Sequence, residues 1–255
     1  MFKKALALLG FVTSMSFAAW DYLPILPKGM GQAVAQFQYS SMDPLSSVDL
    51  VAGIRFSAFN WLELSAILPY RVTTSFDGDN EYIEEKVDKM NGIGNITLGL
   101  RFQFTETFSV YADAYLPGEE TYTESDFFFG VGLQHSSIYT HLIWASDISL
   151  IYGDPWSNQF LKFGTELNVL LGPFVPYAHL DFFYGLESDA PDNGFGYSSD
   201  DEGGGNGLLV GPGLKFAFTP QLSVDLSLGF YMGDRFSTEE IDSPTVFAVG
   251  IYFTF

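Results

Sequence analysis

A strict alternation of apolar and polar residues, repeated in segments of about ten residues, constrains this chain more than any other feature. One such segment carries its apolar side chains at Ile96, Leu98, Leu100, Phe102 and Phe104. A β-strand has a side-chain period of two, so this pattern gives one apolar face and one polar or small face. The chain is therefore predicted to be all-β. After residue 19, no stretch of about 18 uninterrupted apolar residues could form a transmembrane helix.

We predict twelve such strands, most of them near the ~9–11 residues that a tilted strand needs to cross a bilayer. Their predicted bounds are residues 31–40, 47–57, 62–74, 94–104, 108–116, 126–135, 138–152, 159–171, 175–184, 208–218, 222–232 and 245–255.

The connections between these strands are expected to alternate strictly between short and long. The short ones are 58–61, 105–107, 136–137, 172–174 and 219–221, and the long ones include 75–93, 117–125, 186–207 and 233–244. Outer-membrane barrels have tight periplasmic turns at one rim and long extracellular loops at the other. A soluble β-sandwich would instead bury its apolar face against a second sheet. We predict a transmembrane, antiparallel, up-and-down β-barrel of about 12 strands over residues 31–255.

The N-terminus has the pattern of a secretory signal peptide. Lys3 and Lys4 precede an apolar run, and Ser16 and Ala18 supply the small residues that a signal peptidase reads. The alternative is an N-terminal membrane anchor, but the apolar run is short for ~30 Å of hydrocarbon. We expect cleavage after residue 18 and a periplasmic N-terminal segment at residues 19–30. The sequence leaves open whether residues 20–30 instead fold into the pore.

The C-terminus ends on an alternating strand with Phe253 and Phe255 among its apolar positions. A terminal phenylalanine there resembles the recognition signal of the outer-membrane barrel assembly machinery. The alternative is an edge strand that ends in Phe by chance. An even number of strands brings both termini to the periplasmic side. We therefore expect localisation in the bacterial outer membrane, with the assembly machinery and periplasmic chaperones as partners.

Charge excludes several classes of function. The chain has 31 acidic and 11 basic residues, so a nucleic-acid partner is not expected. Without cysteine it has no disulfide or thiolate metal site. The stretches 76–89, 117–126, 186–207 and 233–244 hold 20 of the acidic residues. They predict acidic extracellular loops, which are solvated or bind divalent ions that bridge to lipopolysaccharide. Outer-membrane lipids are expected partners, and no cofactor or specific metal site is predicted.

The inward positions of the strands carry charges of both signs. Lys215 should face Asp225 across a tight turn, and Glu166 should lie close to His179 and Asp181. Either these charges only neutralise one another, or they line a constriction that filters solutes by size and sign. The predicted lumen-lining residues are Arg55, Glu63, Arg71, Arg101, Asp113, Lys162, Glu166, His179, Asp181, Lys215 and Asp225.

Three stretches of the N-terminal half carry a family resemblance. They are LPILPKG at 23–29, WLELSAILPYR at 61–71 and GIGNITLGLRF at 92–102. They are similar to the MetA-pathway-of-phenol-degradation family of outer-membrane proteins, which has an LELG…PY strand and then GLGDLTLGLKY. Asn95 stands where that family usually has Asp. The resemblance implies a transporter-like barrel that passes aromatic or other hydrophobic molecules.

We expect a monomeric, porin-like channel for passive uptake of small molecules. One alternative is a structural or adhesion barrel with a plugged lumen. Another is a lipid-modifying enzyme, which needs a nucleophile, a base and an orienting group together. None of His135, His141 and His179 is expected at the outer membrane surface beside a plausible serine, so we predict no catalytic residues. A lipid-exposed histidine–serine pair would favour the enzyme.

Overall fold

The computed structural model describes residues 22–77, 87, 91–118, 127–153, 160–186, 206–233 and 243–255. The predicted signal peptide, residues 1–18, lies outside these residues, and so do most acidic residues of the predicted loops. Among the described residues, no helix has the length and apolar character needed to cross a membrane.

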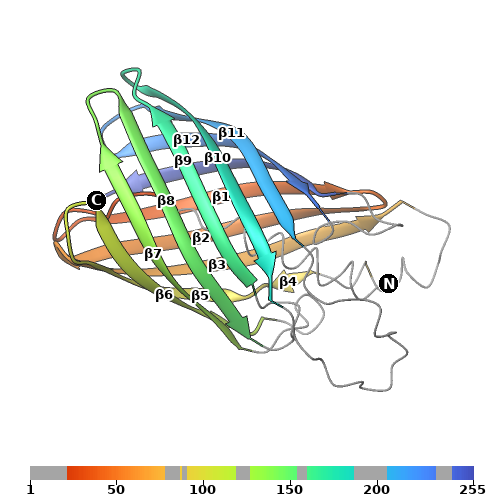
Figure 1. Cartoon of the computed structure of the whole chain (residues 1–255). Coiled ribbons are helices and arrows are strands. Elements are labelled where there is room, and N and C mark those ends of the chain that lie inside the picture. The colour runs from red at the N-terminus through yellow and green to blue at the C-terminus, as the bar shows by residue number, and fades with distance from the viewer. Residues whose placement is uncertain are drawn as a thin grey trace.

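Nearly all of the described chain forms a single antiparallel sheet that closes on itself (Figure 1). Each long strand pairs with its neighbours in the sequence, and β1 also pairs with β13, so no long edge is left open. The strands are β1 (Gly31–Met42), β2 (Leu45–Phe59), β3 (Leu62–Phe76), β4 (Gly92–Ile93), β5 (Ile96–Gln103), β6 (Phe108–Leu116), β7 (Phe128–Ile138), β8 (Leu142–Gly153), β9 (Phe160–Val169), β10 (Phe174–Gly185), β11 (Gly207–Ala217), β12 (Leu222–Met232) and β13 (Thr245–Thr254).

The short strand β4 pairs only with Tyr70 and Arg71 of β3, and the other twelve strands make the barrel. The end of the chain closes the wall, because the backbone of Phe255 exchanges hydrogen bonds of 2.8 and 2.9 Å with Gly31. Closure satisfies backbone groups that lipid cannot. The predicted all-β transmembrane barrel of about 12 strands is thus confirmed.

The two faces of the wall differ as the alternation predicts. On β13, Phe247, Ile251 and Phe253 are exposed on the outside, whereas Val246 and Tyr252 are buried on the inside. The same contrast runs around the barrel, with apolar side chains outside and many buried polar ones inside. An apolar outer surface of this kind is what hydrocarbon tails require.

One predicted turn is wrong. The connection between β7 and β8 lies at residues 139–141 and not at 136–137, because Ser136 pairs with Ala145 and Ser137 with Trp144. The turn is closed where the Tyr139 N–H donates to the Leu142 carbonyl at 2.7 Å. The two serines suggested a turn by composition, but serine also fits a strand when its hydroxyl has a partner. The hydroxyl of Ser137 has one in His135.

The predicted strict alternation of short and long connections also fails once. The connection between β1 and β2 is only residues 43–44, although it lies at the same rim as the long connections. Proline at the second of these positions favours so tight a turn. We call this end of the barrel the long-loop rim. The opposite end, with connections 60–61, 104–107, 139–141, 170–173 and 218–221, is the short-turn rim.

Aromatic side chains gather on the outside of the short-turn rim. The rings of Phe59 and Trp61 stack with centroids 5.0 Å apart, and Trp61 meets Phe102 at 5.4 Å. Phe174 and Phe216 make a similar contact at 4.8 Å. Aromatic belts of this type mark the boundary between hydrocarbon and headgroups. The belt fixes the height of this rim in the membrane.

Candidate functional site: the barrel interior

The chain enters the barrel before it joins the wall. The carbonyl of Leu23 accepts hydrogen bonds from Arg101 Nη1 at 2.9 Å and Gln134 Nε2 at 3.3 Å. The carbonyl of Pro24 accepts from Arg55 Nη1 at 3.2 Å, and the Leu26 N–H donates to Glu63 at 3.0 Å. We call residues 22–26 the luminal segment. Part of the segment assigned to the periplasm at residues 19–30 thus lies inside the barrel.

The luminal segment lies inside the barrel because of the chemistry of both partners, the buried arginines and the backbone of the segment. Buried guanidinium groups need acceptors, and the carbonyls of an irregular, proline-containing segment are not used by any strand ladder. The luminal segment supplies these carbonyls to arginines on β2 and β5. It therefore adds backbone acceptors to those that the wall offers these arginines.

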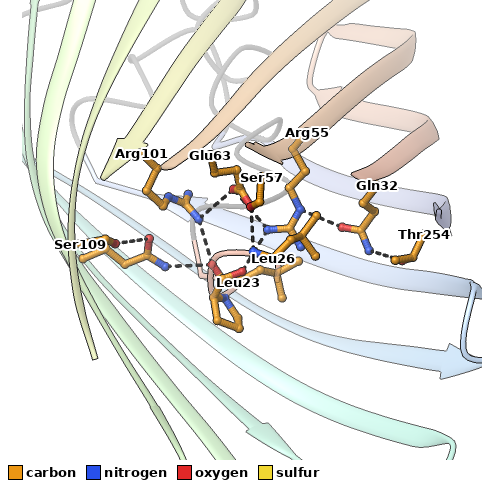
Figure 2. A network of polar contacts seen from close by, with 11 residues as sticks. Leu23, Leu26, Gln32, Arg55, Ser57, Glu63, Arg101, Ser109 and Thr254 are labelled. Atoms are coloured by element: carbon orange, nitrogen blue, oxygen red, sulfur yellow. Dashed lines mark hydrogen bonds and ion pairs between the residues drawn. The ribbon is translucent and has the colours of Figure 1, made fainter. Parts of the chain in front are cut away.

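A cluster of charges holds the luminal segment at the short-turn rim. Glu63 on β3 lies 3.5 Å from Arg55 on β2 and 3.7 Å from Arg101 on β5, and all three are buried. Figure 2 shows the two arginines converging on Glu63 beside Leu23 and Leu26. We call Arg55, Glu63 and Arg101 the rim triad. It joins three strands and the luminal segment in one network.

A second ion pair lies further toward the long-loop rim. Arg71 on β3 binds Asp49 on β2 through Nε at 2.8 Å and Nη2 at 3.2 Å, and both side chains are fully buried. A register shift after Val48 brings Asp49 opposite Arg71 and leaves Val72 as an extra residue. A bulge of this type re-aims side chains. Asp49 was not among the predicted lumen-lining residues.

The tip of the luminal segment reaches the opposite wall. The Tyr22 hydroxyl donates to Asp181 on β10, and the ammonium of Lys162 on β9 lies 5.5 Å from the Tyr22 ring. Lys162 also pairs with Asp147 on β8 at 3.4 Å. Any side chain in place of Gly164 would collide with Tyr22, Asp147 and Asp181. Glycine is what lets these three groups meet.

The remaining predicted residues lie on the inner face of β6 and of β9 to β12. Lys215 and Asp225 are register partners as expected, but the Lys215 ammonium contacts Glu166 at 3.3 Å. Asp225 instead accepts a hydrogen bond from Tyr177 at 2.9 Å. His179 pairs in register with Glu166. Asp113 is half-buried on β6, opposite Gly99.

Apolar side chains also line part of the interior, which the sequence patterns did not predict. Near the long-loop rim, side chains from seven strands pack in one buried cluster, which we call the apolar ring. Its members are Phe128, Ile151, Phe160, Phe183, Leu209, Tyr231 and Val246. The inward parity of these positions was visible in the sequence. Inward positions were, however, expected to be polar or small.

A cavity lies between the luminal segment and one side of the wall. It has a volume of about 120 Å³ and is lined by residues of β1 and β9 to β13 together with Tyr22 and Leu23. Four tyrosines line it, namely Tyr22, Tyr177, Tyr231 and Tyr252, so we call it the tyrosine cavity. Within the described ranges, no group of three or more His, Asp or Glu side chains is arranged to hold a metal ion.

The outer face carries one further polar pair. Ser137 Oγ lies 2.8 Å from His135 Nε2 on β7, and the His135 ring packs between those of Phe108 and Trp144. Phe108 and Trp144 are exposed on the outside of the barrel. This pair lies near the short-turn rim, so it does not test the expectation for the outer membrane surface, but it is a lipid-facing histidine–serine pair of the kind that would favour the enzyme. The pair escaped the sequence analysis because residues 136–137 belong to the strand and not to a turn.

No model of a protein family matches this chain, and no curated protein is significantly similar to it. Membership of the phenol-degradation family thus stays a prediction. Solved structures do match. The COG4313 outer membrane channel from Pseudomonas putida F1 aligns over 92% of this chain and 98% of its own, with 16% identity and a TM-score of 0.64.

Two other structures share the architecture. The NanC porin aligns over 87% of this chain and 98% of its own, with 9% identity and a TM-score of 0.56. The translocator domain of the autotransporter NalP from Neisseria meningitidis aligns over 98% of both chains, with 13% identity and a TM-score of 0.54. At these identities the likeness establishes the fold, a membrane β-barrel used by channels and by autotransporters.

Proposed function

We propose that this protein is a channel of the bacterial outer membrane for passive uptake of small molecules, and that it is not an enzyme. One observation carries the proposal: a closed, lipid-facing barrel has an inner face of buried charges around a cavity. The similarity to the Pseudomonas putida F1 channel and the NanC porin supports the same reading.

The proposed path has three stages. A solute enters at the long-loop rim and passes the apolar ring. It then reaches the tyrosine cavity, and it leaves past the luminal segment and the rim triad. Such an interior selects by size at the apolar ring and by charge further in. In the proposed role, the lumen-lining residues form this filter.

The finer points of the proposal rest on the sequence. The resemblance to the phenol-degradation family favours aromatic or hydrophobic solutes. We propose a monomer in contact with outer-membrane lipids and lipopolysaccharide, whose short-turn rim faces the periplasm. Phe253 and Phe255, both exposed on the outside, are proposed as the signal read by the assembly machinery.

Liposome swelling tests the proposal directly. Vesicles that contain the protein should swell in isotonic solutions of small sugars, amino acids and aromatic acids at rates that fall with solute size. Vesicles containing an equal mass of the protein unfolded before reconstitution are the control for leakage. Swelling no faster than in this control, for every solute, would remove the transport function.

A plugged structural barrel is the second candidate, because the luminal segment occupies part of the lumen. Planar bilayer recordings separate the two. The channel predicts discrete current steps with the intact protein. The structural barrel predicts none, and it predicts steps only after residues 19–26 are deleted.

A lipid-ester hydrolase is the third candidate, and the contact between His135 and Ser137 favours it. In the part of the chain that the structure describes, no carboxylate or amide side chain bonds to the other ring nitrogen of His135. The pair therefore lacks the group that orients the base. Release of fatty acid from phospholipid micelles that is abolished by Ser137→Ala would establish this activity. Equal release by protein and variant would exclude it.

A further inference from the structure

The tyrosine cavity is large enough for a small organic molecule. Its volume is about 120 Å³. A water occupies ~30 Å³ of liquid and an apolar cavity of ~150 Å³ binds benzene, so this cavity holds on the order of four waters or a ligand built on one aromatic ring. A monocyclic aromatic compound with a short polar tail has this size.

The two ends of the cavity differ in polarity. Toward the long-loop rim its walls are Leu209, Tyr231 and Val246, which belong to the apolar ring. Toward the short-turn rim its walls include Asp225 and Lys215. A ligand with an apolar body and a polar head fits this gradient in one orientation only, with its head toward the short-turn rim.

Polar groups without protein partners face the same space. Tyr252 is 7% exposed, and its hydroxyl bonds to no described residue. The side chains of Gln36, His179 and Ser227 also line the cavity, and none of them makes a hydrogen bond within the described part of the chain. These groups face the cavity, where water or a polar ligand can bond to them.

The charges around the cavity determine whether it favours a positively or a negatively charged polar group on the ligand. Three carboxylates line it, those of Glu166, Asp181 and Asp225, together with the ammonium of Lys215, while the Lys162 ammonium lies 5.5 Å from the Tyr22 ring and pairs with Asp147. The Lys215 ammonium is already engaged by Glu166 at 3.3 Å and by Asn168 at 3.4 Å. A positive head relieves this excess of negative charge, and a carboxylate adds to it.

We infer that the tyrosine cavity binds small amines with an apolar body, such as arylalkyl amines. The apolar body packs against Leu209 and Val246, and the protonated nitrogen lies beside Asp225 and the Tyr252 hydroxyl. This inference rests on the proposed channel function, because it names the class of solute that binds in the lumen during passage. It differs from the family resemblance, which says nothing about the charge of the solute.

Three probes of nearly equal size separate the possibilities: 2-phenylethylamine, 2-phenylethanol and phenylacetate. Each is added to single channels in planar bilayers at neutral pH, and interruptions of the ion current are counted. Binding of each probe to the protein in detergent is measured by calorimetry. We expect 2-phenylethylamine to bind about tenfold or more tightly than phenylacetate, with the alcohol between them.

Two substitutions test the location. Asp225→Asn keeps the shape and an acceptor for Tyr177, and should reduce the preference for amine over acid by about tenfold. Tyr252→Phe removes only a hydroxyl, and should weaken the amine and the alcohol alike. The matched control is Tyr184→Phe, the same change at an exposed position on the outer face, which should alter neither. Circular dichroism and thermal unfolding establish that each variant is folded.

The outcomes separate this inference from the proposed function. Equal binding of the three probes, or a preference for phenylacetate, overturns the amine site even if the channel conducts. If the Asp225→Asn and Tyr252→Phe variants both still prefer the amine, the amine does not bind in the tyrosine cavity. Preferential amine binding in detergent without any conductance supports the site and overturns the channel.

Discussion

Substitution of Glu63 by alanine tests how the luminal segment is held. The Glu63 carboxylate is 3% exposed, lies 3.5 and 3.7 Å from two guanidinium groups, and accepts the Leu26 N–H at 3.0 Å. Without it, Arg55 and Arg101 lose their shared counter-charge. Breaking a buried ion pair by removal of one partner typically costs about 3–5 kcal/mol. We therefore expect Glu63→Ala to lower the free energy of unfolding by about this amount.

The same substitution should open the lumen. A hydrogen bond to a charged group contributes about 1.5–3 kcal/mol, and Glu63 provides one such bond to the luminal segment. Since about 1.4 kcal/mol is a factor of ten, the population with the segment displaced should rise about 10- to 100-fold. Loss of this carboxylate beside two arginines should also favour anions.

Single-channel recordings in a salt gradient measure both effects. Glu63→Ala should show more frequent or larger openings and a reversal potential shifted toward anions. Glu63→Gln keeps an acceptor for Leu26 but loses the charge, so it should show the anion shift with fewer added openings. Wild-type conductance and reversal potential in Glu63→Ala would refute the proposed role of the rim triad.

Three further results are expected. Arg71→Ala or Lys162→Ala leaves a buried carboxylate without its basic partner, so the reversal potential should move toward cations; an unchanged potential would mean that these pairs are only structural. Gly164→Ala should lower stability by about 1–3 kcal/mol in thermal unfolding, because its methyl group collides with the Tyr22 hydroxyl, whereas Gly130→Ala has ordinary contact distances of 3.5 Å or more and should be nearly neutral. Deletion of residues 19–26 should raise single-channel conductance, and the same conductance as the intact protein would show that the luminal segment does not limit the pore.

The outer face was predictable because lipid imposes one rule on it. Most outward positions must be apolar, so Phe247, Ile251 and Phe253 follow from the alternation of one strand alone. The closed sheet then follows from the need to pair all backbone groups. The strand count and most strand bounds agree with the sequence for this reason.

The interior obeys no such rule. An inward side chain is satisfied by whatever lies across the lumen, which comes from distant parts of the chain. Phe160 and Phe183 are inward and fully buried, because they pack against each other and against neighbouring strands. The alternation within a single strand cannot show which side chains of other strands pack against an inward residue. Inward positions were expected to be polar or small, so these large apolar side chains were missed.

Partners across adjacent strands depend on register, and register depends on turns and bulges. Asp49 meets Arg71 only because of the shift after Val48, which no residue pattern signalled. The contact of His135 with Ser137 was missed because two serines in succession resemble a turn. The luminal segment has no repeating pattern, so its position could not be derived before the arginines that bind it were placed.

The contacts of the luminal segment also order the events of assembly. Its few residues touch β2, β3, β5, β7 and β10, and the bond from Tyr22 to Asp181 spans 159 positions of the chain. These strands stand around it only when the sheet has nearly curled shut. We therefore expect the segment that precedes the first strand to reach its final surroundings late in folding, after the barrel has closed.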